Sequence, residues 1–95
     1  MAIKVLIQRK ARKGKEEELN RIVRELRWKA MYAEGFISGE TLRSIDDPSV
    51  HLVISTWKSI EDWKKWLNSS YRKEIKKKLK EVIAGAEKMT AYQYE

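Results

Sequence analysis

Apolar residues change their spacing several times along the chain, and each change marks a switch between strand and helix. The first of them, Ile3, Val5 and Ile7, occupy alternate positions, which is the period of a strand. From about Lys15 to Glu34 they recur at every third or fourth position, which predicts a helix with one buried side. Gly35 follows directly and can adopt the positive φ that commonly ends a helix.

The second half of the chain repeats this alternation. The predicted elements are strands at 36–45 and 50–57, a short helix capped by Ser59, a helix at 71–86 and a last strand at 88–95. The full order of strand, helix, strand, strand, helix pair, strand is that of the ferredoxin-like α+β fold, βαββαβ with an antiparallel sheet. The buried sides of the second and last strands stay open.

Length and composition limit the number of domains and the cofactors that the chain can bind. Ninety-five residues predict one domain over 1–95, and 42% hydrophobic residues suffice for its core despite a net charge of +7. Cysteine is absent and histidine occurs once, so we expect no metal, flavin or haem to be carried. Because the apolar runs are too short to cross a bilayer, we expect a cytoplasmic domain that does not bind membranes.

Helices of this fold cover only one face of the sheet, so the other face needs another cover. It is predicted to carry the side chains of Leu6, Gln8, His51, Val53, Ser55 and Trp57. That is more apolar surface than a protein leaves in water. Two compatible solutions follow, a homodimer through the open sheet face and a flat aromatic ligand bound in the space so formed.

The basic run from Arg72 to Lys80 raises the question of nucleic-acid binding. RNA-recognition domains share this element order but stack bases on exposed aromatic residues of the first and third strands, within a characteristic motif. That motif is missing, and the first strand has no aromatic residue. The lysines are therefore predicted to form the solvated side of a helix, with no nucleic-acid partner.

The sequence resembles the antibiotic biosynthesis monooxygenase family along nearly the whole chain. The similarity is carried by the stretch 35–42, a turn containing Pro48, and above all by Trp57, Ser59 and Trp66. The resemblance implies a dimeric α/β barrel. Several members of that family oxygenate aromatic polyketides or open haem without a metal or flavin of their own.

A position-by-position comparison limits which activity carries over. In the haem-degrading branch, an Asn on the first strand, a Trp on the short helix and a His ten residues later form the site. Trp66 matches the Trp, but the first position falls near Ile7 or Gln8 and the last on Lys76, and protonated lysine is a poor iron ligand. The resemblance therefore implies a cofactor-independent monooxygenase acting on a flat phenol or quinol; the alternative is a non-catalytic small-molecule-binding or structural dimer.

Two residues are candidates for catalysis. His51 has a side chain whose ordinary pKa of about 6.5 suits removal of a phenolic proton, although a histidine at a strand end can equally be a surface residue. Gln8 is a neutral polar residue on an otherwise apolar strand face, and it would need a partner if buried.

Four aromatic residues are candidates for substrate binding. Trp66 is predicted to form a cavity wall, together with either Trp57 or the pair Tyr92 and Tyr94 across the sheet. Trp57 can equally belong to the core or to a dimer interface, and the two tyrosines can equally make a dimer contact.

Overall fold

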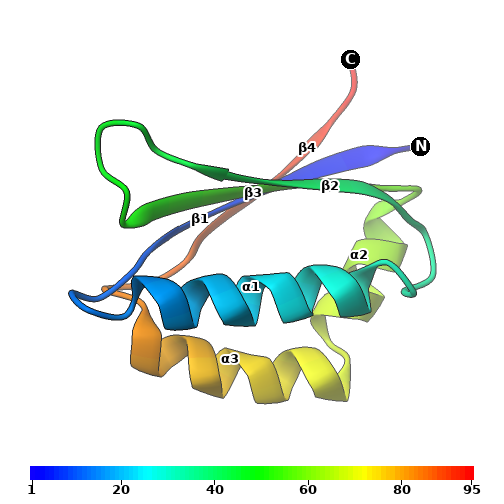
Figure 1. The fold of residues 1–95 in the computed structure, drawn as a ribbon. Helices are drawn as coiled ribbons and strands as arrows, with labels where there is room; N and C mark the ends of the chain where they lie inside the picture. The colour runs from blue at the N-terminus through cyan, green and yellow to red at the C-terminus, as the bar shows by residue number, and fades with distance from the viewer.

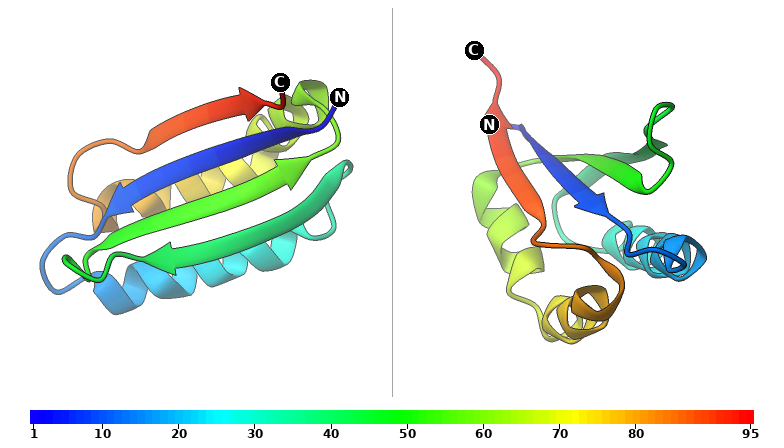
Figure 2. Two further views of the ribbon diagram at one scale, coloured as in Figure 1. Left: turned by 90° about the horizontal axis from the view of Figure 1, so that it is seen from above. Right: turned by 90° about the vertical axis from the view of Figure 1, so that its left-hand side faces the viewer.

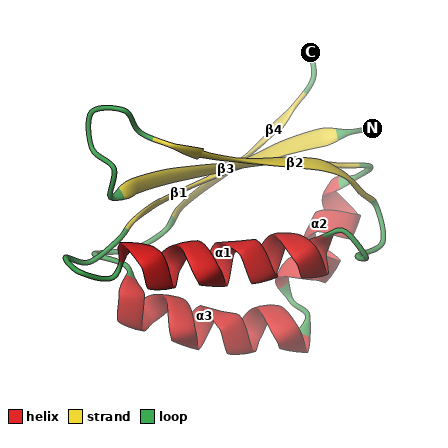
Figure 3. Ribbon diagram, viewed as in Figure 1, coloured by secondary structure: helices red, strands yellow, loops and turns green.

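The computed structural model describes residues 1–95 as one antiparallel sheet with three helices on one of its faces (Figures 1 and 3). The elements are β1 (Ile3–Lys10), α1 (Glu16–Ala30), β2 (Phe36–Arg43), β3 (Val50–Trp57), α2 (Ile60–Leu67), α3 (Ser70–Val82) and β4 (Lys88–Gln93). The strand order is β2-β3-β1-β4, seen from above in the left panel of Figure 2. The predicted ferredoxin-like α+β fold is thereby confirmed.

The pairing of β1 with β3 decides which side chains face the helices. Ile3, Val5 and Ile7 are buried under the helices, and Ile3 lies directly opposite Trp57 in the antiparallel register. Residues directly opposite one another in such a pair share a face of the sheet. The register continues to Arg9 opposite His51, so alternate residues of β3 from 51 to 57 also face the helices.

The prediction that His51, Val53, Ser55 and Trp57 lie on the open face is therefore wrong. Both parities of β3 carry apolar residues, so the spacing within this strand cannot tell its two faces apart. Only the register with β1 separates them, and it places Val50, Leu52 and Ile54 on the open face instead. Leu6 and Gln8 lie on the open face as predicted.

Pairing also settles the two outer strands, which the sequence left open. A register shift between Phe36 and Ser38 places Glu40 and Leu42 of β2 on the open face, beside Ile54 and Leu52. In β4, Tyr92 lies opposite Lys4 and therefore on the open face.

The helices are held by local sequence signals, several of which were expected. The hydroxyls of Ser59 and Ser69 accept hydrogen bonds from the backbone at the starts of α2 and α3. Gly35 has a φ of 81°, but α1 already ends at Ala30, four residues before its predicted end. Likewise α3 ends at Val82 rather than 86, because Ile83 turns to an extended conformation and bridges to Ala11, the residue after β1.

Two apolar clusters connect the helices to the sheet. One lies between α1 and α3 and includes Leu19, Leu26 and Leu79; the other joins β1 and β3 to α2 through Trp57 and Trp63. Partly buried Val53 and Trp66 pack against both clusters. No helix combines the length and apolar character needed to span a membrane.

Candidate functional site

A cavity lies between the helix-covered face of the sheet and all three helices, where the two apolar clusters meet. Its volume is about 50 Å³. Apolar side chains form most of its wall, among them Ile7, Val53 and Trp57 from the sheet and Leu26 and Trp66 from the helices. The cavity thus has a largely apolar, aromatic lining and lies on the helix-covered face, with the exposed residues Arg27, Glu40 and Thr41 at its rim.

The aromatic wall is a packed cluster built around Trp57. The indole of Trp57 is fully buried and stacks on that of Trp66, with ring centroids 6.2 Å apart and an interplanar angle of 27°. Trp63 and Phe36 pack on Trp57 at centroid distances of 5.6 and 5.4 Å. The Trp57 Nε1–H donates a hydrogen bond to Ser55 Oγ at 3.0 Å, which fixes the ring's orientation.

Trp66 lies between the cavity and an outer groove. It lines both the cavity and an outer groove of about 350 Å³ between the end of α1 and the α2–α3 junction. On the groove side its ring lies 5.9 Å from that of Tyr71, over which Lys29 Nζ sits at 5.5 Å. Burial, assisted by the nearby Glu25 carboxylate, raises the pKa of Tyr71 to about 12, so its hydroxyl stays protonated at neutral pH.

Two guanidinium groups reach into this otherwise apolar interior. Arg9 from β1 and Arg72 from the first turn of α3 are each only 3% exposed, and both line the cavity. The Arg9 Nε–H donates to Glu87 Oε2 at 2.6 Å, forming a buried ion pair. The only hydrogen bond of Arg72 that involves a side chain is that of its backbone N–H to Ser69 Oγ, and no carboxylate lies within ion-pair distance of its guanidinium. Burial lowers the pKa of Arg72, and the nearby Glu87 opposes that shift.

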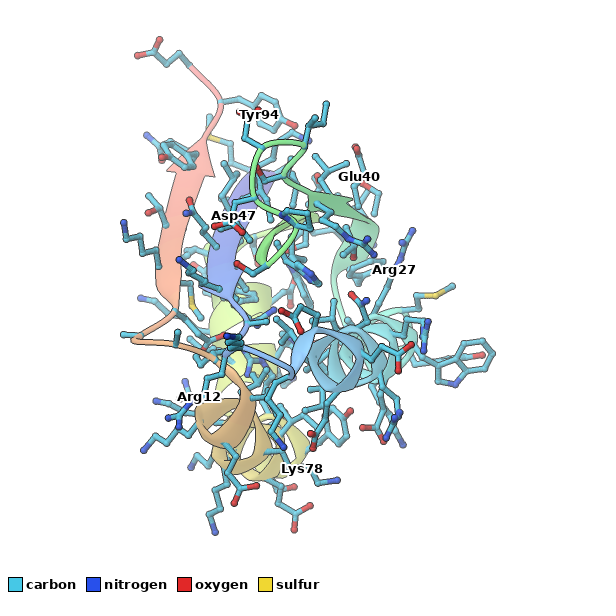
Figure 4. The ribbon with its side chains drawn as sticks, turned by 60° about the vertical axis from the view of Figure 1, so that its left-hand side comes forward. Arg12, Arg27, Glu40, Asp47, Lys78 and Tyr94 are labelled. Atoms are coloured by element: carbon cyan, nitrogen blue, oxygen red, sulfur yellow. The ribbon has the colours of Figure 1, made fainter.

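A third arginine closes the cavity rim between α1 and β2. The Arg27 Nη2–H donates to the Gly39 carbonyl at 2.9 Å, and Figure 4 shows Arg27 on α1 and Glu40 on β2. Gly39 has little free space around its Cα, since a Cβ there would come within 3.3 Å of the Phe36 ring. The lack of a side chain at Gly39 therefore lets the Phe36 ring lie close to the backbone of β2 at the rim.

His51 is not the surface residue that a strand-end position suggested. It is 2% exposed, lies opposite Arg9 under the helices, and neither ring nitrogen has a hydrogen-bond partner. It does not line the cavity. Burial, and then the charges of Arg43 and Arg9, lower the pKa of His51 below its ordinary value of 6.5.

This buried histidine predicts a pH dependence of stability. Below about pH 6.5 the unfolded chain binds a proton at His51 that the folded chain does not bind, until the pH reaches the lowered folded pKa. The free energy of unfolding should therefore fall in that window, by at most about 1.4 kcal/mol per pH unit. Urea unfolding at pH 7.5 and 5.5 should show a larger loss for the wild type than for His51→Leu; equal losses would contradict the assignment.

The structure brings only two of the six predicted site residues together. Trp57 and Trp66 share the cavity wall, whereas Gln8 is exposed on the open face and so lies on the other side of the sheet from His51. Tyr92 and Tyr94 are each 53% exposed and do not line the cavity. Figure 4 shows Tyr94 at the end of the molecule opposite α1 and α3.

Sequence reasoning missed the buried arginines, although signals for both exist. Arg9 continues the alternation of Ile3, Val5 and Ile7 and so shares their buried face. Arg72 precedes Ile75 by three residues and therefore lies on the apolar stripe of α3. The burial of Arg72 was not predicted, because the whole basic run from Arg72 to Lys80 was assigned to the solvated side of the helix.

The fold is that of a small ferredoxin-like α+β protein, with an aromatic-lined cavity between its sheet and helices. The chain belongs to the antibiotic biosynthesis monooxygenase family, whose sequence profile matches residues 2–78. Among curated protein sequences, none matches this chain closely enough to count as a relative.

Solved structures share the fold over nearly their full length. A conserved protein from Methanosarcina mazei is 20% identical with a TM-score of 0.93, covering 100% of this chain and 94% of its own. A protein from Mycobacterium tuberculosis is 12% identical with a TM-score of 0.92 and coverages of 100% and 96%. SnoaB, a cofactor-independent oxygenase from Streptomyces nogalater, is 12% identical with a TM-score of 0.88 and coverages of 98% and 92%.

Proposed function

We propose that the chain is a cofactor-independent monooxygenase that acts on a small, electron-rich phenol or quinol. The observation that carries the proposal is the cavity wall formed by the stacked rings of Trp57 and Trp66, which suits a planar aromatic ligand. Membership of the monooxygenase family and the shared fold with a cofactor-independent oxygenase support it.

The reaction balances without an external reductant. One atom of O₂ becomes a new carbonyl oxygen on the ring, and the other leaves as water with the two hydrogens that the phenol loses as it becomes a quinone. The substrate supplies all the electrons, so the protein's task is to bind and orient the substrate, exclude water and stabilise the substrate as an anion. The indoles of Trp57 and Trp66 would orient the ring, and the cavity's guanidinium groups would stabilise negative charge.

Binding of a substrate requires the small cavity to widen, and Trp66 is placed to provide that movement. The cavity's volume of about 50 Å³ lies below the roughly 300 Å³ typical of ligand pockets. A change of the Trp66 rotamer would join the cavity to the outer groove of about 350 Å³ and provide the necessary room. In this proposal the Trp66 side chain lines the cavity and also controls the entry of substrate from the outer groove.

Oxygen consumption with 1-naphthol tests the activity. In buffer containing a chelator, we expect the purified chain to consume one O₂ for each 1,4-naphthoquinone formed, at a rate proportional to protein concentration. Tyr94→Phe, altered at an exposed position outside the cavity, should match the wild type. No uptake above the spontaneous rate with 1-naphthol or a panel of other phenols and quinols would overturn the proposal.

A second candidate is a non-catalytic structural dimer, and the small volume of the cavity favours it. In that case side chains fill the former pocket and the phenols neither bind nor react. Quenching of tryptophan fluorescence by 1-naphthol under argon separates the two, because only the monooxygenase proposal expects saturable binding at the cavity wall.

The same proposal includes a homodimer formed through the open sheet face. That face carries apolar side chains without a covering helix, namely Leu6, Leu42, Val50, Leu52, Ile54 and Tyr92, the open-face patch. Leu42 and Tyr92 are 45% and 53% exposed in the single chain. Packing two such faces against one another would remove this surface from water.

Charge placed in the middle of the open-face patch should separate the dimer. Leu52 lies on β3 between Gln8 and Leu42, so Leu52→Glu would bury an unpaired carboxylate in the interface. We expect sedimentation equilibrium to give a dimer for the wild type and a folded monomer for Leu52→Glu. Lys78→Gln, which changes the net charge equally on α3, should remain dimeric (Figure 4). A wild-type monomer at tens of micromolar would contradict the interface.

A further inference from the structure

We propose that Arg72 forms an anion subsite in the cavity, where a phenolic ligand is held as its phenolate. The inference deepens the proposed function and rests on it, because it names the ionic state in which the substrate binds. Its basis is a buried guanidinium that lines the cavity and has no partner within the chain.

The first step is the cost of burying Arg72. A guanidinium remains charged at any pH at which the protein is folded, and a buried charge is expensive unless it is paired or hydrogen-bonded. With 3% of its surface exposed, Arg72 has lost nearly all contact with bulk water. A position that retains such a group without a partner in the chain is suited to a partner that arrives from outside.

The second step is the distribution of the neighbouring charges. Glu87 is a half-buried carboxylate whose charge acts on Arg72, and Arg9 already occupies it with a direct ion pair of 2.6 Å. Two guanidiniums therefore share one carboxylate, which leaves one positive charge. Glu40 belongs to the cavity rim, but its side chain lies on the open face of the sheet and makes no ion pair with Arg72.

The third step is the end of the helix on which Arg72 lies. The N-terminus of a helix is positive, and the first turns of α1 and α2 carry acidic residues that compensate for it. The first turn of α3 carries none, and Arg72 lies within it. The helix end therefore adds to the positive potential of Arg72 rather than offsetting it.

The chemistry of the lining then selects the ligand. The flat aromatic wall suits a ring, and the single unpaired positive charge suits one negative oxygen on it. No His, Lys, Cys or Tyr lines the cavity, the Glu40 side chain lies on the open face of the sheet, and arginine does not accept a proton. The phenol's O–H bond therefore breaks with its electron pair left on oxygen, the proton passes to solvent, and Arg72 binds the resulting anion.

The ionisation of bound 4-nitrophenol tests this subsite directly. Neutral and ionised 4-nitrophenol have different absorption spectra, so the pKa of the bound phenol can be followed by titration under argon. We expect the wild type to lower that pKa by at least one unit. This shift corresponds to at least tenfold tighter binding of the anion than of the neutral phenol. Arg72→Met should abolish the shift while leaving the affinity for uncharged 4-nitroanisole unchanged, and Arg72→Lys should retain part of it.

Two results would overturn the subsite. In the first, the wild type binds the neutral and ionised forms of 4-nitrophenol equally; in the second, Arg72→Met lowers the pKa of bound 4-nitrophenol as much as the wild type does. If Arg72→Met does not fold, the wild type and Arg72→Lys still decide, since a cation at this position must favour the anion over 4-nitroanisole.

The test is independent of oxygenation. The para position of 4-nitrophenol is blocked, so this compound cannot form the para-quinone and reports on binding alone. A lowered pKa without oxidation of 1-naphthol would support the anion subsite and overturn the oxygenase. Oxidation of 1-naphthol without a lowered pKa of 4-nitrophenol would support the oxygenase and overturn the anion subsite.

Discussion

Replacing Glu87 by Gln is expected to lower the free energy of unfolding by about 3 kcal/mol. The Glu87 carboxylate is the direct partner of Arg9 and its charge acts on Arg72, and both guanidiniums are buried. Breaking a buried ion pair from one side costs about 3–5 kcal/mol, because the remaining charge stays buried without compensation. The lower end applies because the Glu87 side chain is 12% exposed and water can partly replace it.

Urea unfolding followed by circular dichroism measures this change. Glu34→Gln is a matched control, since Glu34 pairs with Lys65 at 2.9 Å but both side chains are about 70% exposed. Exposed ion pairs contribute little, so the control should unfold at nearly the same urea concentration as the wild type. A loss at Glu87 no larger than that at Glu34 would contradict the account of the buried arginines.

Trp66→Phe should reduce the kcat/KM for 1-naphthol by about tenfold or more while lowering the melting temperature only slightly. The smaller ring loses part of the stacking surface on Trp57 and the wall toward the outer groove. Trp66 is only partly buried, so its truncation leaves a space that solvent can reach.

Trp63→Phe is the matched comparison on the same helix. Trp63 is 5% exposed and packs against Trp57 in the core, so its truncation should lower the free energy of unfolding by about 2 kcal/mol. If Trp66→Phe instead lowers stability by several kcal/mol and no phenol or quinol binds, Trp66 is a core residue and the proposed site is wrong.

Strand and helix order could be predicted from the sequence because each element carries its own local signal. The alternation of Ile3, Val5 and Ile7 and the caps at Ser59 and Ser69 do not depend on distant residues. The faces of β3 are different, because both parities are apolar and only pairing with β1 distinguishes them. The sequence predicted His51 on the open face, and only the pairing of β3 with β1 shows that it lies under the helices.

The candidate site was predictable to a similar extent. The family resemblance pointed to Trp57 and Trp66, whose indoles do share the cavity wall. Gln8 and His51 were chosen for their chemistry alone, and the sheet separates them. Arg72 was hidden among exposed basic residues, since charge usually marks the solvated side of a helix and the isolated sequence does not show which cation is buried.

Mass spectrometry of the product formed from 1-naphthol under ¹⁸O₂ tests the central claim most directly. With a chelator present and rapid extraction, 1,4-naphthoquinone should carry one ¹⁸O atom, the second atom of O₂ should appear in water, and Trp66→Phe should form the product more slowly. Unlabelled quinone, or labelled quinone formed no faster than without protein, would contradict a monooxygenase that works at the Trp57–Trp66 cavity.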